Sequence, residues 1–152
     1  MNNQSYCKQI TTSASPLTVF QAVTINFDKW WTPGSQPVIN IGDQVTFQFE
    51  PTYWVMQATK LEPNELVEYE CIESRHYHEG LPDSILEEWK GTKLRWNIER
   101  AKGITTVKFI HEGLIPSLDC YDICEGGWDY FFVESLKKYL DQVESNNNVV
   151  TE

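Results

Sequence analysis

The sequence lacks the features that mark nucleic-acid-binding, secreted and membrane proteins. Only 12 of its 152 residues are Lys or Arg, against 22 acidic residues, and the resulting net charge of −10 repels phosphate backbones. The apolar runs fall far short of the ~20 residues that span a bilayer. The first residues lack the basic and apolar regions of a signal peptide. We therefore expect a cytoplasmic protein that binds no nucleic acid and has no membrane span.

Cysteine is also scarce in this chain. Cys7, Cys71, Cys120 and Cys124 are too few and too scattered for a disulfide framework. Cys120 and Cys124 stand four residues apart where a helix is expected to begin, and such a pair could supply two metal ligands. A structural zinc site needs four ligands, so we favour buried apolar thiols.

No motif in the sequence indicates a cofactor, a metal or a nucleophile. A Gly-rich phosphate loop and a nucleophile elbow are both absent, so no cofactor is expected. His76 and His78 lie two residues apart beside Glu79, but a metal would need a third ligand, for which only His111 is conceivable. We therefore predict no metal site and interpret this segment as a solvated loop.

Aromatic residues, by contrast, are abundant and lie in alternating patterns. Six Trp, seven Tyr and seven Phe make up 13% of the chain, which is a large share for a small domain. Apolar and polar residues alternate in several segments, as is typical of antiparallel strands with one wet face. The strands are expected at residues 5–12, 44–50, 53–61, 66–71, 93–99 and 105–111. Segment 73–91 breaks the pattern and is expected to be a long connection that covers part of the sheet.

Two short helices are expected after the first strand. Ser15 is a suitable N-cap, and Pro16 suits a first helical turn. The rings at residues 27–31 indicate a further helical turn, which Pro33 and Gly34 would end.

A long amphipathic helix is expected at the C-terminus. Apolar residues recur at 3–4 spacing from residue 120 to residue 143, and Ser117 or Asp119 can cap the helix. Gly126 and Gly127 interrupt it at a cost of roughly 1 kcal/mol each relative to Ala. The favoured explanation is that the helix passes close to a strand, and the other is a bend beside a ligand.

Together these elements predict a single α+β domain. Six or seven antiparallel strands would form a curved sheet that wraps around the C-terminal helix, because one helix cannot cover a flat sheet of that width. Residues 1–144 are expected to form this domain, and residues 145–152 a flexible polar tail.

Several motifs resemble those of the START-like, polyketide-cyclase-like (SRPBCC) superfamily, which has the helix-grip fold. They are Ser-Ala-Ser-Pro-Leu-Thr-Val-Phe at 13–20, Trp30-Trp31, the segment Trp89 to Leu94, the segment Val107 to Leu114, Gly127-Trp128 and the segment Ser135 to Leu140. The pattern is most similar to the branch named for activators of a heat-shock chaperone ATPase, and it extends over nearly the whole chain. The resemblance implies a fold rather than an activity, because members include lipid carriers, aromatase/cyclases and hormone receptors.

An internal cavity between the sheet and the C-terminal helix is the expected ligand site. Such pockets are mostly apolar with a few polar groups, and rings from the inward faces would line this one. The predicted lining residues are Phe47, Phe49, Tyr69, Trp96, Phe109, His111, Trp128 and Phe132. The same residue types would also fill a sealed core, so close packing is the alternative for each ring.

His111 is the one candidate for catalysis. It is in phase with Val107 and Phe109 and should point inward near the end of a strand, where an imidazole can act as an acid or base near neutral pH. The favoured interpretation is a half-exposed histidine that is hydrogen-bonded to nearby backbone, since the sequence places no acidic residue to assist it.

Three functions fit these expectations. The first is binding of a small hydrophobic or aromatic molecule in the cavity. The second is a cyclase/dehydratase-like or hydrolase-like enzyme that uses His111 and a tyrosine such as Tyr69. The third, suggested by the resemblance alone, is regulation of a chaperone through protein interaction. A homodimer is compatible with each of them, and the sequence fixes neither the ligand nor the presence of catalysis.

Overall fold

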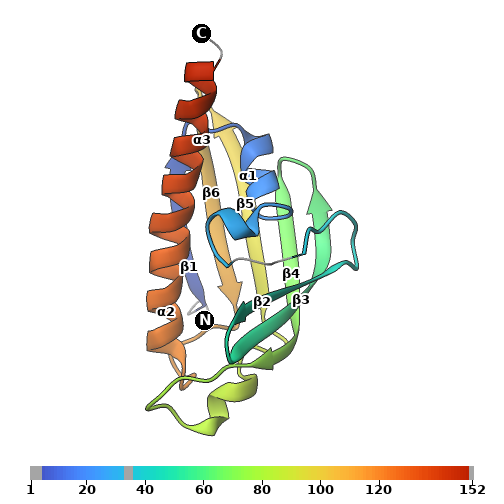
Figure 1. Ribbon diagram of the computed structural model, residues 1–152, viewed down its shortest axis with the longest axis vertical. Coiled ribbons are helices and arrows are strands. Elements are labelled where there is room, and N and C mark those ends of the chain that lie inside the picture. The colour runs from blue at the N-terminus through green and yellow to red at the C-terminus, as the bar shows by residue number, and fades with distance from the viewer. Residues whose placement is uncertain (1–4, 33–35, 151–152) are drawn as a thin grey trace.

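A single curved antiparallel sheet forms the centre of the protein (Figure 1), whose computed structural model describes residues 5–32 and 36–150. Its six strands pair in the order β1-β6-β5-β4-β3-β2, so that β1 and β2 are the edges. The strands are β1 (Tyr6–Thr12), β2 (Gln44–Phe49), β3 (Thr52–Glu62), β4 (Leu66–Arg75), β5 (Lys93–Ala101) and β6 (Ile104–Glu112). The prediction of a curved sheet of six or seven strands is confirmed.

The long C-terminal helix runs along the length of the molecule beside β1 (Figure 1). It consists of the consecutive segments α2 (Tyr121–Trp128), π-helical η3 (Asp129–Leu136) and α3 (Lys137–Val150). Helix α3 thus continues to Val150, into the segment for which the sequence predicts a polar tail. Within residues 5–32 and 36–150, no helix combines the length and hydropathy needed to cross a bilayer. The arrangement is the predicted α+β helix-grip fold.

Two short helices follow β1, as predicted: α1 (Pro16–Ala22) and the 3-10 turn η1 (Phe27–Lys29). Ser15 caps α1, because its Oγ accepts a hydrogen bond from the backbone N–H of Thr18 at 3.2 Å. Pro33 and Gly34, which were expected to end the second turn, lie outside the described residues.

The start of the C-terminal helix differs from the prediction that Ser117 or Asp119 caps it. The N-cap of α2 is Cys120, whose side chain makes no capping hydrogen bond. Instead the carboxylate of Glu88 accepts hydrogen bonds from the backbone N–H groups of Asp119 and Cys120, at 2.9 and 3.0 Å. Glu88 follows the 3-10 turn η2 (Asp83–Glu87) in the long connection, so that connection supplies the cap from outside the helix.

The space between sheet and helix is filled by aromatic rings. Trp96 on β5 lies opposite Phe109 on β6, and both are fully buried, as the alternation of these strands predicts. Phe27 in η1 packs against rings from both the sheet and the neighbouring turn: Trp30, Trp31, Phe47, Tyr69 and Trp96. The turn η1 and the residues after it therefore fill the central part of the space between the sheet and the C-terminal helix.

Candidate functional site

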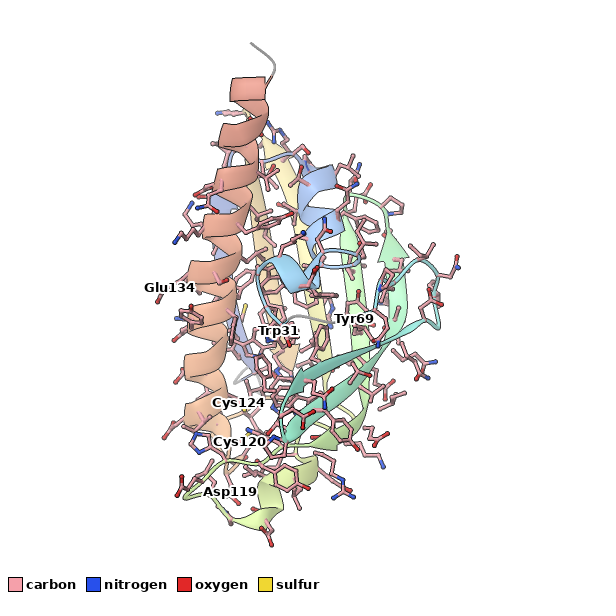
Figure 2. The ribbon with its side chains drawn as sticks, viewed as in Figure 1. Trp31, Tyr69, Asp119, Cys120, Cys124 and Glu134 are labelled. Atoms are coloured by element: carbon pink, nitrogen blue, oxygen red, sulfur yellow. The ribbon has the colours of Figure 1, made fainter. Side chains whose placement is uncertain are left out.

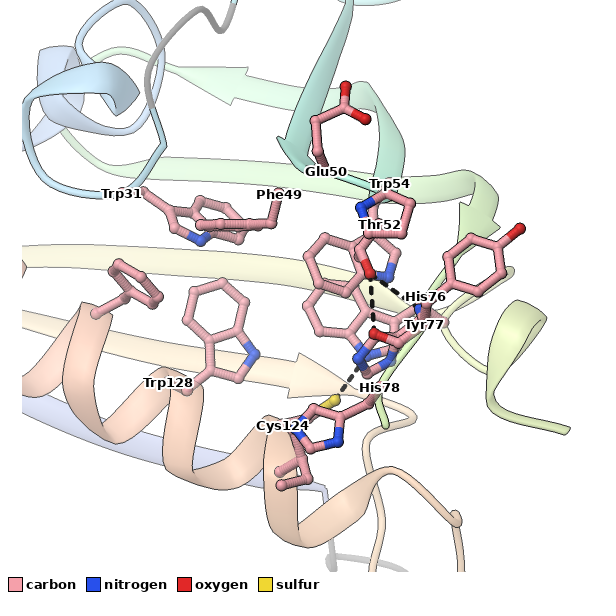
Figure 3. Close-up of a pocket in the computed structure, with 15 residues that line it drawn as sticks. Trp31, Phe49, Glu50, Thr52, Trp54, His76, Tyr77, His78, Cys124 and Trp128 are labelled. Atoms are coloured by element: carbon pink, nitrogen blue, oxygen red, sulfur yellow. Dashed lines mark hydrogen bonds between the residues drawn. The ribbon is translucent and has the colours of Figure 1, made fainter. Parts of the chain in front are cut away.

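A pocket of about 290 Å³ opens where the corner between β2 and β3 faces helix α2 (Figure 3). Its wall also includes residues 76–78, which follow β4, and Trp89 at the end of the long connection. The pocket thus lies between sheet and C-terminal helix, but at the edge formed by β2 and β3. The aromatic rings that fill the central space between sheet and helix do not extend to this edge, so a pocket is left there.

Flat aromatic side chains make up a large share of the pocket wall, in which six of the fifteen lining residues are Trp or Phe. They are Trp31, Phe49, Trp54, Trp89, Trp128 and Phe131. Trp54 and Trp89 stack with ring centroids 4.1 Å apart and planes 17° apart. Trp128 lies nearly parallel to Trp89, at 15° and 6.0 Å. Such walls present broad π-faces to whatever enters the pocket.

His111 holds two of these rings in place. Trp128 Nε1–H donates to His111 Nδ1 at 3.0 Å, so the histidine proton lies on Nε2, which donates to Thr92 Oγ1 at 2.9 Å. Thr92 in turn donates to the backbone carbonyl of Trp89 at 2.6 Å. The expectation of a half-exposed histidine bonded to backbone is wrong, since His111 is fully buried and bonds to side chains. This burial lowers its pKa to about 3. The imidazole therefore stays neutral and orients the rings of Trp89 and Trp128.

The eight residues predicted to line a cavity are divided by the structure. Only Phe49 and Trp128 lie on the wall of the pocket. The other six are completely buried and belong to the packed core: Phe47, Tyr69, Trp96, Phe109, His111 and Phe132. Tyr69, the suggested partner of His111 in catalysis, donates its hydroxyl proton to the carbonyl of Val23 at 2.7 Å. Tyr69 and His111 therefore do not converge in a pocket, so this pair lacks the arrangement that shared acid-base catalysis requires.

The two helical glycines have a different explanation from the favoured one. A Cβ added to Gly126 or to Gly127 would meet no atom within 4 Å, so neither glycine permits a close approach to a strand. Gly127 instead lines the pocket, whereas Gly126 is exposed outside it. The π-helical segment η3 begins two residues later, at Asp129, and such segments frequently occur at functional sites. The glycine at 127 keeps pocket volume open that any side chain would occupy.

Polar groups at the rim and under the wall are few. Glu50, Tyr77 and His78 are exposed polar residues of the wall, and the hydroxyl of the buried Thr52 accepts from the backbone N–H of Tyr77 at 2.9 Å (Figure 3). Among the described residues, three buried side-chain atoms lack a hydrogen-bond partner: Trp54 Nε1, His76 Nδ1 and Trp96 Nε1. Trp54 and His76 are pocket residues, and each such buried group costs about 1–3 kcal/mol when it is left unpaired.

One group of buried side chains beside the pocket has the composition of a metal site. Ligand atoms of His76, Cys120 and Cys124 lie within 4.8 Å of one another. The sequence pairs the two cysteines but predicts no metal, because their third partner comes from the connection that follows β4. His78 and His111, considered with His76 from their spacing, do not join this group.

Comparisons with known proteins agree with the fold and leave the activity open. No family model matches the chain, and no curated protein does. The Aha1 dimer from Colwellia psychrerythraea is 27% identical, with a TM-score of 0.73 over 90% of this chain and 96% of that one. The chain has the START-like, polyketide-cyclase-like fold.

Two further START-like structures show how widely this fold is used. An HSP90 activator from Plasmodium falciparum has a TM-score of 0.66 at 15% identity and covers 91% of this chain and 96% of its own. DynU16, from the dynemicin biosynthetic locus, has the same TM-score and identity, and the match covers 91% of this chain and 48% of that one. At 15% identity these two likenesses concern the fold alone.

Proposed function

We propose that the protein binds a small planar hydrophobic or aromatic molecule in the pocket between the β2–β3 corner and helix α2. The observation that carries this proposal is a wall built from four tryptophans and two phenylalanines around a helical glycine. The four tryptophans are themselves buried, whereas Phe49, Tyr77 and Ile123 leave more than a third of their surface exposed around the pocket. An aromatic guest covers such apolar surface with offset or edge contacts.

The size of the pocket limits the ligand. Small-molecule sites usually measure about 300–1,000 Å³, and a cavity of about 150 Å³ holds benzene. A volume of about 290 Å³ therefore suits a compact molecule of about two fused rings.

Thermal unfolding in the presence of planar bicyclic compounds tests the proposal. Naphthalene, indole and 2-naphthol are suitable probes, and a chelator should be present throughout. A ligand that binds only the native state stabilises it by about 2.7 kcal/mol at 100 times its Kd. For a domain of this size we expect an increase in Tm of about 5–10 °C.

A pair of neighbouring glycine variants separates pocket binding from general stabilisation. Gly127→Leu should fill the pocket and abolish the ligand-induced shift, while Gly126→Leu should retain it. Both variants gain helix propensity, so neither is expected to unfold the protein. The proposal fails if no compound raises the Tm, or if Gly127→Leu responds as strongly as the native chain.

The second candidate is regulation of a heat-shock chaperone. It is favoured by the similarity to the Aha1 dimer and by an apolar rim around the pocket, where Phe49, Tyr77 and Ile123 are 36%, 45% and 40% exposed. ATP hydrolysis by an HSP90-type chaperone should then increase when the protein is added, and Ile123→Lys should reduce the effect. Light scattering tests the accompanying expectation of a homodimer. An unchanged hydrolysis rate counts against this candidate.

A further inference from the structure

Three potential metal ligands meet beneath the pocket, at the start of the C-terminal helix. Cys120 is the N-cap of α2 and Cys124 lies one turn further along, so that both thiols are on one side of the helix (Figure 2). Their sulfur atoms are 3.1 Å apart. His76 reaches them from the connection that follows β4, and all three ligand atoms lie within 4.8 Å of one another. Two distant parts of the chain thus contribute to one cluster.

The cluster is buried, and one of its polar atoms has no partner. Cys120, Cys124 and His76 are 0%, 6% and 5% exposed. His76 Nδ1 makes no hydrogen bond, although an unpaired buried nitrogen of this kind is unfavourable. The imidazole also interacts with the Cys120 thiol, and a cation held between them would replace that hydrogen bond. It would also convert two thiols into thiolates whose charges balance a divalent ion, so that the buried cluster stays neutral.

Groups around the cluster are arranged as supports for ligands. Trp89 Nε1–H donates to Cys124 Sγ at 3.2 Å, which orients this sulfur. Glu88 binds the backbone N–H of Cys120 and so fixes the first turn of the helix. The sulfur positions are therefore set by contacts outside the cluster.

We propose that His76, Cys120 and Cys124 bind a zinc ion whose fourth coordination position opens into the pocket. Thiolate and imidazole are the ligands that zinc prefers, and in a tetrahedral site neighbouring ligand atoms lie about 3.5–3.8 Å apart. The observed range, from 3.1 Å between the sulfurs to 4.8 Å at most, brackets this spacing. Zinc binding would therefore require the two sulfurs to move apart by about 0.5 Å.

The open position follows from the location of the ligands. Cys124 and His76 both form part of the pocket wall, so the face of the ion away from Cys120 points toward the pocket. Three protein ligands and one exchangeable position are the arrangement of zinc sites that bind or activate small molecules, whereas structural sites are closed by four. The metal site and the proposed ligand pocket share two residues but are tested independently, because zinc binding requires no organic ligand.

X-ray absorption of the zinc-loaded protein tests the site without a mutation. The reduced full chain is loaded with zinc, dialysed and assayed for bound metal. We expect one zinc per chain, with two sulfur neighbours at about 2.3 Å and nitrogen or oxygen neighbours at about 2.0–2.1 Å. Absence of bound zinc, or a shell that contains only nitrogen and oxygen, would overturn the proposal.

Cobalt(II) titrations of variants then test the identity of the ligands. The native chain should give the thiolate charge-transfer and tetrahedral d–d absorption of a cobalt–sulfur site. Cys120→Ser, Cys124→Ser and His76→Asn should each weaken binding by more than the ~10–100-fold loss typical of supporting residues. Cys7→Ser, at an exposed thiol on β1, is the matched control and should bind as the native chain does. Equal affinity in the Cys124→Ser and Cys7→Ser variants contradicts the assignment.

Discussion

The buried histidine makes a quantitative prediction about how stability depends on pH. His111 has an ordinary pKa of 6.5, which burial lowers to about 3 in the folded protein. Between these two values the unfolded chain binds one proton more than the folded chain at this position. Stability is therefore complete above about pH 6.5 and decreases as the pH falls toward 3. Burial is the cause of the lowered pKa, and Trp128 Nε1–H in addition occupies the nitrogen that would accept the proton.

The magnitude follows from linkage. Each pH unit within the window costs about 1.4 kcal/mol, so acidification from pH 7.5 to pH 5 should lower the free energy of unfolding by about 2 kcal/mol. This is a large share of the 5–15 kcal/mol expected for a domain. Burial raises the pKa of Glu68, but hydrogen bonds from Thr59 and Arg95 lower it more, and its net pKa lies below 4.5. The contribution of the Glu68 carboxylate to stability is thus lost only below pH 4.5, outside the interval from pH 7.5 to pH 5.

Urea unfolding at several pH values measures this effect, and a histidine variant isolates it. His111→Gln keeps a donor and an acceptor but has no group that titrates. Between pH 7.5 and pH 5, the free energy of unfolding of this variant should therefore fall by about 2 kcal/mol less than that of the native chain. Zinc should be removed with a chelator beforehand. Equal pH dependence in the native chain and in His111→Gln would show that His111 is not the neutral buried group described above.

Other substitutions test the packing and the helix start. Trp96→Ala should lower the free energy of unfolding by about 3–5 kcal/mol, because this ring is fully buried among other rings. Tyr69→Phe should cost about 1–2 kcal/mol, since it removes the hydrogen bond to Val23. Glu88→Ala should cost about 0.5–2 kcal/mol through loss of the cap of α2. Gly126→Ala should add about 0.5–1 kcal/mol, because the site is open and helical. Denaturant unfolding measures the free energy of unfolding of all four variants. A change of the opposite sign would contradict the role given above to the substituted residue.

The fold could be predicted because its signals are local. Alternation along residues 93–99 and 105–111 specifies which side chains face inward, and the observed pairing of Trp96 with Phe109 follows from it. The end of β4 was less predictable. This strand continues to Arg75 instead of ending near Cys71, because its last residues pair with the start of β3, with Ser74 opposite Trp54 and Arg75 opposite Tyr53. Such a contact between separate segments leaves no periodic trace in the sequence.

The pocket could not be placed in the same way. Its wall and the core are built from the same residue types, so composition does not reveal which rings are covered. Phe27 and its neighbours decide the outcome, since they fill the middle of the grip and leave Trp31 and Trp54 at its edge. Gly127 was the one sequence feature that indicated where the pocket lies, because a glycine inside a helix lowers stability and needs a reason. In the structure the space beside Gly127 is open, which favours a pocket there over close approach to a strand.

The long connection ties these features together. β4 and β5 are adjacent antiparallel strands, and a turn of two to five residues is enough to join such a pair. The chain uses residues 76–92 instead, and from this excess come the third metal ligand, the helix cap and one of the stacked rings: His76, Glu88 and Trp89. All three act on the first turns of α2. Residues 76–92 are longer than the pairing of β4 with β5 requires. Their contacts to the start of α2 give the best explanation for this length, because these contacts build the pocket and the proposed zinc site.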